Sequence, residues 1–212
     1  MGSYGWIEGC VDGEDKLITK DTPLDFADTW PSERIRAGSL AYNFGATYAW
    51  MRLIDTHGMS PEQIEAHQRV YAGHCLMHDV MNAWIWSYGQ NGSPDSALLA
   101  WGMNNDLVMF WPFWRNEDVI LGDTPDVKVS AWSRTDRLLL CAMNYSKSAA
   151  ATAEITIDLA AMRVLLGENA GAWNLEKPSE KLPCKISRAG TLVRVAIPAR
   201  DYRLVAIGEP RR

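Results

Sequence analysis

Residues 126–146 read DVKVSAWSRTDRLLLCAMNYS, and this stretch decides the fold class of the carboxy-terminal part of the chain. Apolar and polar residues alternate in two short runs on either side of a turn, which is the pattern of a pair of β-strands. Similar runs follow as AEITIDL, TLVRVAIPA and DYRLVAIG. About seven strands with frequent turn signals predict a small antiparallel β-sandwich over residues 126–212. The side chains expected to face its core are Val127, Val129, Leu138, Leu140, Ile155, Ile157, Val193, Val195, Leu204 and Ala206.

The first 125 residues have a different sequence pattern, with helical periodicity and eight of the ten tryptophans. A helix is expected over 32–45, a buried strand over 46–54, a helix from Ser60 and a second strand over 82–86. For the helix from Ser60, the sequence predicts that Ser60 caps it, that Pro61 takes its first position and that Gln63 completes a capping box. One more helix is expected over 94–110.

A strand, a helix and a strand in this order predict a βαβ unit, which builds parallel sheets and barrels. A complete eight-stranded barrel needs roughly 250 residues, so this region has room for only part of one. We therefore expect an α/β plus all-β fold. A partial (β/α) barrel-like region over 1–125 is followed by the β-sandwich over 126–212.

One face of the predicted helix after Ser60 carries three of the four histidines. The side chains on this arc are Ile64, His67, Val70, Tyr71, His74, Cys75, His78 and Met81. The spacing of His74 and His78 lets two imidazoles share a metal ion, but no acidic residue lies on the same arc. The alternative is a buried stripe in which the imidazoles bond to carbonyl and carboxylate oxygens. We favour that alternative, and the sequence predicts neither a metal site nor a cofactor.

Composition excludes several classes of partner. The formal net charge is −5 with scattered Lys and Arg, which gives phosphate backbones no basic patch to bind, so we expect no nucleic acid partner. Apolar runs stay far below the ~20 residues that span a bilayer, so we expect no membrane association. The four cysteines are widely spaced, which favours reduced and mostly buried thiols over a disulfide framework.

Chemistry in barrels sits where the strands end, and this places the candidate site residues. Glu8 and Asp55 are the two carboxyl candidates for catalysis, each at the expected end of a strand. The candidates for substrate binding are Arg52, Trp84, Trp86 and Tyr88. Indole faces suit sugar rings, although a tryptophan serves equally well as a core anchor.

Several motifs together resemble glycoside hydrolases. The aromatic bridge FWPFWRN, the strand pair at 127–146, AEITIDL, GAWNLE and the last strand after IPARDYRLVAI resemble the sandwich that follows the catalytic barrel in many of these enzymes. The segments WPSERIRAGSLAYNFGATYAWM and HQRVYAGHCLMHDV are similar to the last barrel turns of proteins related to the retaining β-N-acetylgalactosaminidase group. The resemblance covers about residues 25–208.

The resemblance implies a barrel with an acid/base carboxyl group and either a second carboxylate or the substrate's acetamido group as nucleophile. In the N-acetylgalactosaminidase group, an Asp-Glu pair earlier in the barrel is catalytic, and this sequence contains no Asp-Glu dipeptide. We therefore expect the carboxy-terminal portion of a carbohydrate-active protein that is not catalytic alone. The alternatives are a non-catalytic carbohydrate-binding module and a structural interaction module. A homo-oligomer or the missing barrel portion would cover the open sheet edge.

Overall fold

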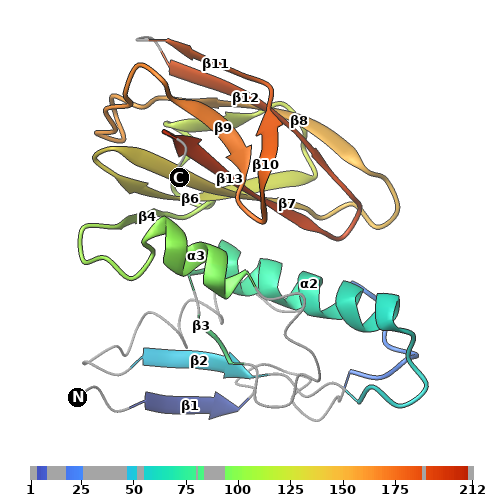
Figure 1. The fold of residues 1–212 in the computed structure, drawn as a ribbon. Coiled ribbons are helices and arrows are strands. Elements are labelled where there is room, and N and C mark those ends of the chain that lie inside the picture. Colours follow the sequence, from blue (N-terminus) through green and yellow to red (C-terminus); the bar gives the residue numbers. More distant parts are fainter. Residues whose placement is uncertain are drawn as a thin grey trace. The chain divides into compact units, whose positions relative to one another are not determined.

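A computed structural model describes the fold (Figure 1). It describes residues 4–8, 18–25, 47–51, 55–79, 81–83, 94–187 and 190–209, with the backbone alone for the strands at 4–8, 47–51 and 81–83. Contacts within the chain divide it into two compact units, Met1–Ser93 and Pro94–Arg212. The described residues are mostly β-structure with few helices, and two of the three sheets are antiparallel. In the described part of the chain, no helix has the length and apolar character needed to cross a membrane.

The first unit contains a parallel three-stranded sheet in the order β1-β2-β3. Its strands are β1 (Tyr4–Glu8), β2 (Thr47–Met51) and β3 (Met81–Ala83), and helix α2 (Pro61–Met77) connects β2 to β3. The predicted βαβ unit is therefore confirmed, because β2 and β3 run parallel on either side of the helix. The helix predicted over 32–45 lies outside the described residues.

The start of α2 follows its sequence signals. The hydroxyl of Ser60 accepts the backbone N–H of Gln63 at 3.2 Å, and the Gln63 side chain accepts the N–H of Ser60 at 2.9 Å. Pro61 occupies the first turn, where its missing N–H costs nothing. The predicted capping box is confirmed, and such a cap contributes about 1 kcal/mol to helix stability.

The histidine stripe of α2 is buried, as the sequence predicts. One ring nitrogen of His67 lies 2.8 Å from the carbonyl oxygen of Gln63 and the other lies 2.8 Å from that of Thr22. His78 places Nδ1 2.8 Å from the carbonyl oxygen of His74. Within the described ranges, no group of three or more His, Cys, Asp or Glu side chains is placed to hold a metal ion. The contact between His67 and the carbonyl oxygen of Thr22 links α2 to the segment 18–25.

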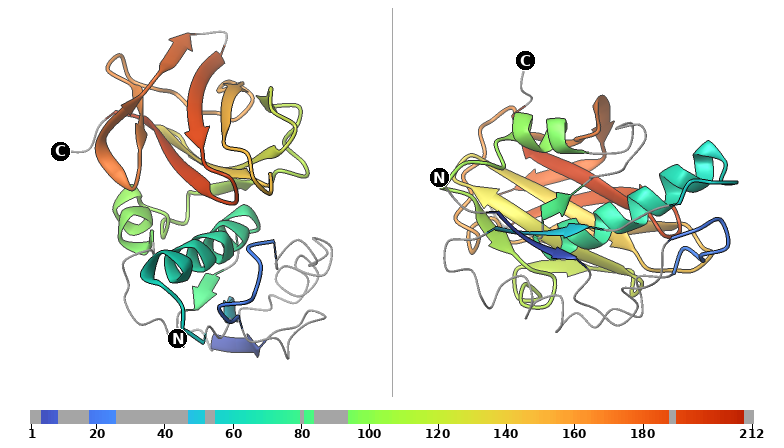
Figure 2. Two further views of the ribbon diagram at one scale, coloured as in Figure 1. Left: turned by 90° about the vertical axis from the view of Figure 1, so that its right-hand side faces the viewer. Right: turned by 90° about the horizontal axis from the view of Figure 1, so that it is seen from below.

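The second unit contains two antiparallel sheets and the short helix α3 (Asp95–Trp101). Figures 1 and 2 show the sheets as two layers, with α3 on the side of the six-stranded sheet that faces away from the four-stranded one. The six-stranded sheet has the order β10-β9-β13-β7-β6-β4, and its strands are β10 (Lys177–Leu182), β9 (Gly171–Asn174), β13 (Tyr202–Gly208), β7 (Arg137–Asn144), β6 (Val127–Arg134) and β4 (Met109–Trp111). The four-stranded sheet has the order β11-β12-β8-β5, and its strands are β11 (Cys184–Ser187), β12 (Gly190–Ile197), β8 (Ala151–Ile157) and β5 (Ile120–Gly122).

A single apolar core lies between the two sheets. It contains eight of the ten side chains that the alternation predicts: Val127, Val129, Leu138, Leu140, Ile155, Ile157, Val193 and Val195. The prediction for the last strand is wrong by one residue, because Val205 and Ile207 enter this core in place of Leu204 and Ala206. Leu204 is also fully buried, on the opposite face of the strand. Both faces of β13 are thus apolar, and alternation alone does not distinguish them.

The helix predicted over 94–110 is also corrected. α3 ends at Trp101, where Gly102 adopts φ 99° and its N–H caps the carbonyls of Leu98 and Leu99. Glycine reaches this left-handed conformation without steric cost, and the helix stops there. β4 then pairs with β6, and β5 pairs with β8, so both strands that precede residue 126 belong to the same two sheets as those that follow it.

Candidate functional sites

The carboxyl ends of the three parallel strands lie level with one another. Glu8 pairs in register with Met51, and Met51 pairs with Ala83. The carboxyl ends of β1, β2 and β3 therefore lie at the same edge of the sheet (Figure 1). In parallel α/β sheets this edge is where ligands bind, because the loops that leave it converge there. We call it the carboxyl edge.

Two of the predicted site residues, Glu8 and Asp55, lie among the described residues. Glu8 is the last residue of β1 and its backbone is described. Arg52, Trp84, Trp86 and Tyr88 lie outside the described residues, so their roles stay predictions.

Asp55 is exposed and belongs to a turn. Its backbone N–H donates to the carbonyl of Ile18 at 2.8 Å, and its Oδ1 accepts the N–H of His57 at 2.9 Å. The second contact is an Asx turn, in which a carboxylate stabilises the loop after a strand. Any catalytic role of Asp55 stays a prediction.

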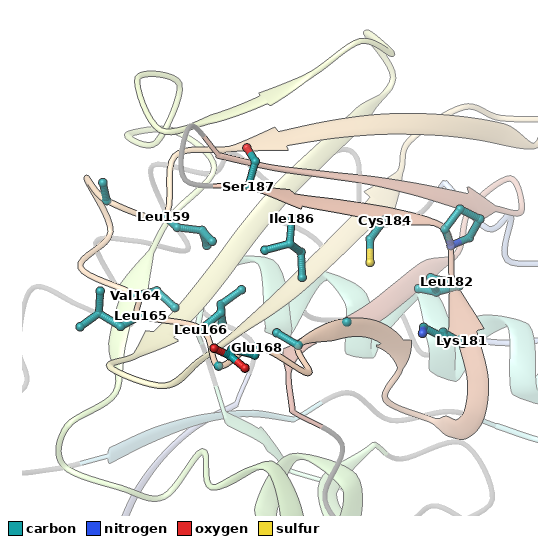
Figure 3. Close-up of a pocket in the computed structure, with 15 residues that line it drawn as sticks. Leu159, Val164, Leu165, Leu166, Glu168, Lys181, Leu182, Cys184, Ile186 and Ser187 are labelled. Atoms are coloured by element: carbon teal, nitrogen blue, oxygen red, sulfur yellow. The ribbon is translucent and has the colours of Figure 1, made fainter.

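A groove of about 990 Å³ lies in the second unit, between the 159–170 loop, the end of β10 and β11 (Figure 3). Figure 3 shows Ile186 and Cys184 on β11 and Leu182 on β10 around the open space. The lining is largely apolar, and Glu168 is the one carboxyl group among the residues that form it. The sequence pattern places no candidate site residue in this unit and does not predict this groove.

A second cavity, of about 510 Å³, lies between α3 and the outer face of the six-stranded sheet. We call it the α3 cavity. Its lining consists of Ala97, Ala100, Trp101, Arg137, Trp173, Asn174, Leu175, Pro178, Ala206, Ile207, Gly208 and Glu209. This size lies within the roughly 300–1,000 Å³ of small-molecule pockets. Trp132 and Trp173 are the two tryptophans after residue 125, and the sequence pattern assigns neither of them to a site.

Three of the other tryptophans pack against an aromatic ring or donate a hydrogen bond within the second unit. The rings of Phe110 and Trp132 lie 5.3 Å apart, and those of Phe110 and Trp114 lie 6.3 Å apart. Trp111 donates its indole N–H to the hydroxyl of Ser133 at 2.8 Å. These three tryptophans therefore have a structural role, because their rings pack or form hydrogen bonds within the second unit.

An ion pair borders the α3 cavity. The guanidinium of Arg137 donates from Nε to both carboxylate oxygens of Asp136 at 3.0 Å, and from a second nitrogen to one of them. The hydrogen bonds from Arg137, together with its charge, lower the pKa of Asp136, and the same contact raises the pKa of Arg137. Asp136 thus holds the guanidinium in place beside the cavity.

The lowered pKa of Asp136 predicts how the stability of the fold depends on pH. A carboxyl group with a depressed folded-state pKa stabilises the fold above its unfolded pKa of about 3.9, and this contribution is lost as the pH falls through the folded value. Asp136→Asn should therefore be less stable than the parent at neutral pH, and the difference should shrink as the pH falls below about 4. Urea unfolding of both proteins between neutral and acid pH measures this. A difference that stays constant over the range would contradict the assigned cause.

Neither cavity of the second unit has the groups that hydrolyse a glycosidic bond. That reaction requires two carboxyl groups roughly 5–10 Å apart in most families. The groove has Glu168 and the α3 cavity has Glu209 as the one carboxyl group among their lining residues. Each described lining therefore supplies one of the two carboxyl groups.

Comparison with known proteins gives matches among solved structures only. No family model matches the sequence, and no curated protein matches it. α-Galactosidase I from Mortierella vinacea is similar in structure, with a TM-score of 0.46 and 13% identity over 98% of this chain and 52% of that one. The family 30 subfamily 8 xylanase Xyn30A from Clostridium acetobutylicum follows with a TM-score of 0.42 and 12% identity over 80% of this chain and 44% of that one.

The maltogenic α-amylase AmyB from Thermotoga neapolitana is also similar, with a TM-score of 0.37 and 12% identity over 88% of this chain and 46% of that one. All three are glycoside hydrolases by their names. The chain spans about half the length of each of them.

Proposed function

We propose that the chain is the carboxy-terminal portion of a glycoside-hydrolase-like protein, that it binds carbohydrate at the carboxyl edge, and that it is not catalytic alone. In this proposal the first unit is the closing part of a (β/α) barrel, and the second is a β-sandwich. The observation that carries the proposal is the register of the parallel strands, which brings Glu8, Met51 and Ala83, the last residues of β1, β2 and β3, to one edge. Barrel enzymes collect their substrate contacts at this edge.

The sheet itself supports the second half of the proposal. In the described ranges, β1 and β3 each pair with β2 alone, so both outer strands have a side open to further pairing. Three strands enclose only part of a site, and catalytic groups in barrels come from several strands. Further barrel strands from a longer protein, or a second copy of the chain, would cover these open edges.

Five of the predicted residues have a specific role in this proposal. Glu8 supplies one carboxyl group at the sugar, and its catalytic partner comes from another strand. Arg52 donates hydrogen bonds to sugar hydroxyls, and Trp84, Trp86 and Tyr88 present ring faces to the sugar. In the N-acetylgalactosaminidase group that the sequence resembles, the catalytic Asp-Glu pair lies earlier in the barrel, and this sequence contains no Asp-Glu dipeptide, so the partner of Glu8 is expected from outside this sheet.

A binding and turnover experiment tests the proposal. The full chain is titrated with N-acetylgalactosamine, galactose and xylose by calorimetry, and hydrolysis of their p-nitrophenyl glycosides is followed. We expect saturable binding that Trp86→Ala weakens by about tenfold, which corresponds to about 1.4 kcal/mol. Hydrolysis should stay at the rate of buffer, with or without Glu8→Gln. Trp114→Phe, in the aromatic cluster of the second unit, is the matched control and should bind like the parent.

Two outcomes would overturn the proposal. Absence of binding for every sugar would remove the carbohydrate function. Turnover that Glu8→Gln lowers by roughly 10²- to 10⁴-fold would show a self-contained enzyme, because that is the contribution of a positioned acid or base.

A further inference from the structure

The indole of Trp173 lies on a surface that the sheet keeps free of side chains. A Cβ placed on Gly171 would lie 2.7 Å from Cη2 of Trp173, and 3.1 and 3.2 Å from the two ring carbons bonded to it. Nearly equal distances of this size describe a point above the face of the ring. Gly171 pairs with Gly208, and Trp173 pairs with Ala206, so small residues surround the indole on the neighbouring strand. The ring therefore lies flat along β9, and Trp173 is half-buried and lines the α3 cavity.

Helix α3 forms the opposite wall. Ala97, Ala100 and Trp101 line the cavity, and their spacing of three and four residues puts them on one face of the helix. The two alanines leave room that larger side chains would fill. Trp101 is 4% exposed, and its indole N–H has no hydrogen-bond partner in the described part of the chain. A buried N–H without an acceptor is costly. Its nitrogen has almost no accessible surface, so a ligand oxygen in the cavity would satisfy it after the indole ring moves.

The charges at the cavity select a neutral ligand. Arg137 and Glu209 contribute one positive and one negative group to the lining, and Arg137 is already paired with Asp136. Because these two charges cancel, the lining has no net charge that would attract an ion. A neutral molecule with both donors and acceptors can bond to the carboxylate and to the indole N–H together.

We propose that the α3 cavity is a carbohydrate-binding site that takes one neutral pyranose ring. The C–H face of the sugar lies on Trp173, a hydroxyl oxygen accepts the N–H of Trp101, and another hydroxyl donates to Glu209. A purely apolar ligand would leave the Trp101 N–H without an acceptor, so it fits less well. The site belongs to a different unit from the carboxyl edge, and it does not require that edge to bind sugar.

Indole N–H signals in ¹H–¹⁵N spectra of the full chain test this proposal, with methyl-galactopyranoside, methyl-xylopyranoside and methyl-glucopyranoside as probes. Trp101→Phe and Trp173→Phe assign the two signals. We expect both signals to shift saturably with at least one probe, with a Kd in the millimolar range. Trp173→Ala should weaken this binding at least tenfold. Trp101→Phe keeps a ring but removes the donor, and should weaken it about threefold to tenfold.

Two controls separate this site from the carboxyl edge. Trp114→Phe and Trp86→Ala should leave the affinity measured on the Trp173 signal unchanged. A sugar that binds with unchanged affinity to Trp173→Ala and is lost in Trp86→Ala would overturn the α3 site while supporting the proposed function. Trp101 and Trp173 signals that do not move with any probe at 100-fold molar excess or more would also overturn it. Because Trp173 is half-buried, its alanine variant should fold, and a near-parental thermal midpoint confirms this.

Discussion

Replacing Asn144 with alanine should lower the free energy of unfolding of the second unit by about 3 kcal/mol. Asn144 is fully buried, and its side-chain nitrogen donates to the carbonyls of Ala149, Ile197 and Pro198 at 2.9, 3.2 and 3.2 Å. Its Oδ1 accepts the N–H of Ser146 at 2.9 Å. One amide thus joins the loop after β7 to the end of β12. Its removal leaves several polar backbone groups unpaired, at least one of them buried.

Urea unfolding followed by far-ultraviolet circular dichroism measures this effect. Asn105→Ala is the matched control, because Asn105 is exposed and its side chain makes one local contact, accepting the N–H of Leu107. It should cost less than 1 kcal/mol. Asn144→Asp should be at least as harmful as the alanine variant, because it turns a carboxylate oxygen toward three carbonyl oxygens. If Asn144→Ala and Asn105→Ala unfold at the same urea concentration, the hydrogen bonds of the Asn144 side chain contribute nothing to the free energy of unfolding.

The features that local sequence predicts well are those that a few neighbouring residues determine. Ser60, Pro61 and Gln63 specify the start of α2 by themselves, and the structure confirms it. The alternation in 127–146 likewise identifies β6 and β7 and their core-facing side chains. In both cases, the signal and the structure lie within a few residues of each other.

The features that the sequence did not predict depend on partners that are distant in the chain. The α3 cavity joins Trp101 to Trp173 and Glu209, and no periodicity relates these positions. A local signal did exist in Gly171-Ala172-Trp173, because a glycine two residues before a tryptophan lies on the same face of a strand and leaves room for its ring. The helix predicted over 94–110 is too long because it includes Gly102, although glycine is the residue that most often ends a helix.

The prediction with the largest expected loss of stability follows from the register of β13. Ile207 is 1% exposed and lies in the core between the sheets, whereas its neighbour Ala206 is half-buried on the outer face beside the α3 cavity. Ile207→Asp places a charge in an apolar core without a partner, and should cost at least about 4 kcal/mol and leave little folded second unit. Ala206→Asp introduces the same charge one residue away, where water reaches it, and should cost about 1 kcal/mol or less.

Expression of both variants followed by thermal unfolding and hydrogen exchange in β7 and β13 compares them directly. The alternation in DYRLVAIG, read from sequence alone, gives the opposite order, with Ala206 in the core and Ile207 outside it. Equal stability of the two aspartate variants, or a greater loss for Ala206→Asp, would contradict the register of β13 with β7 and β9. That register also sets Ala206 opposite Trp173, so the same experiment tests the floor of the α3 cavity.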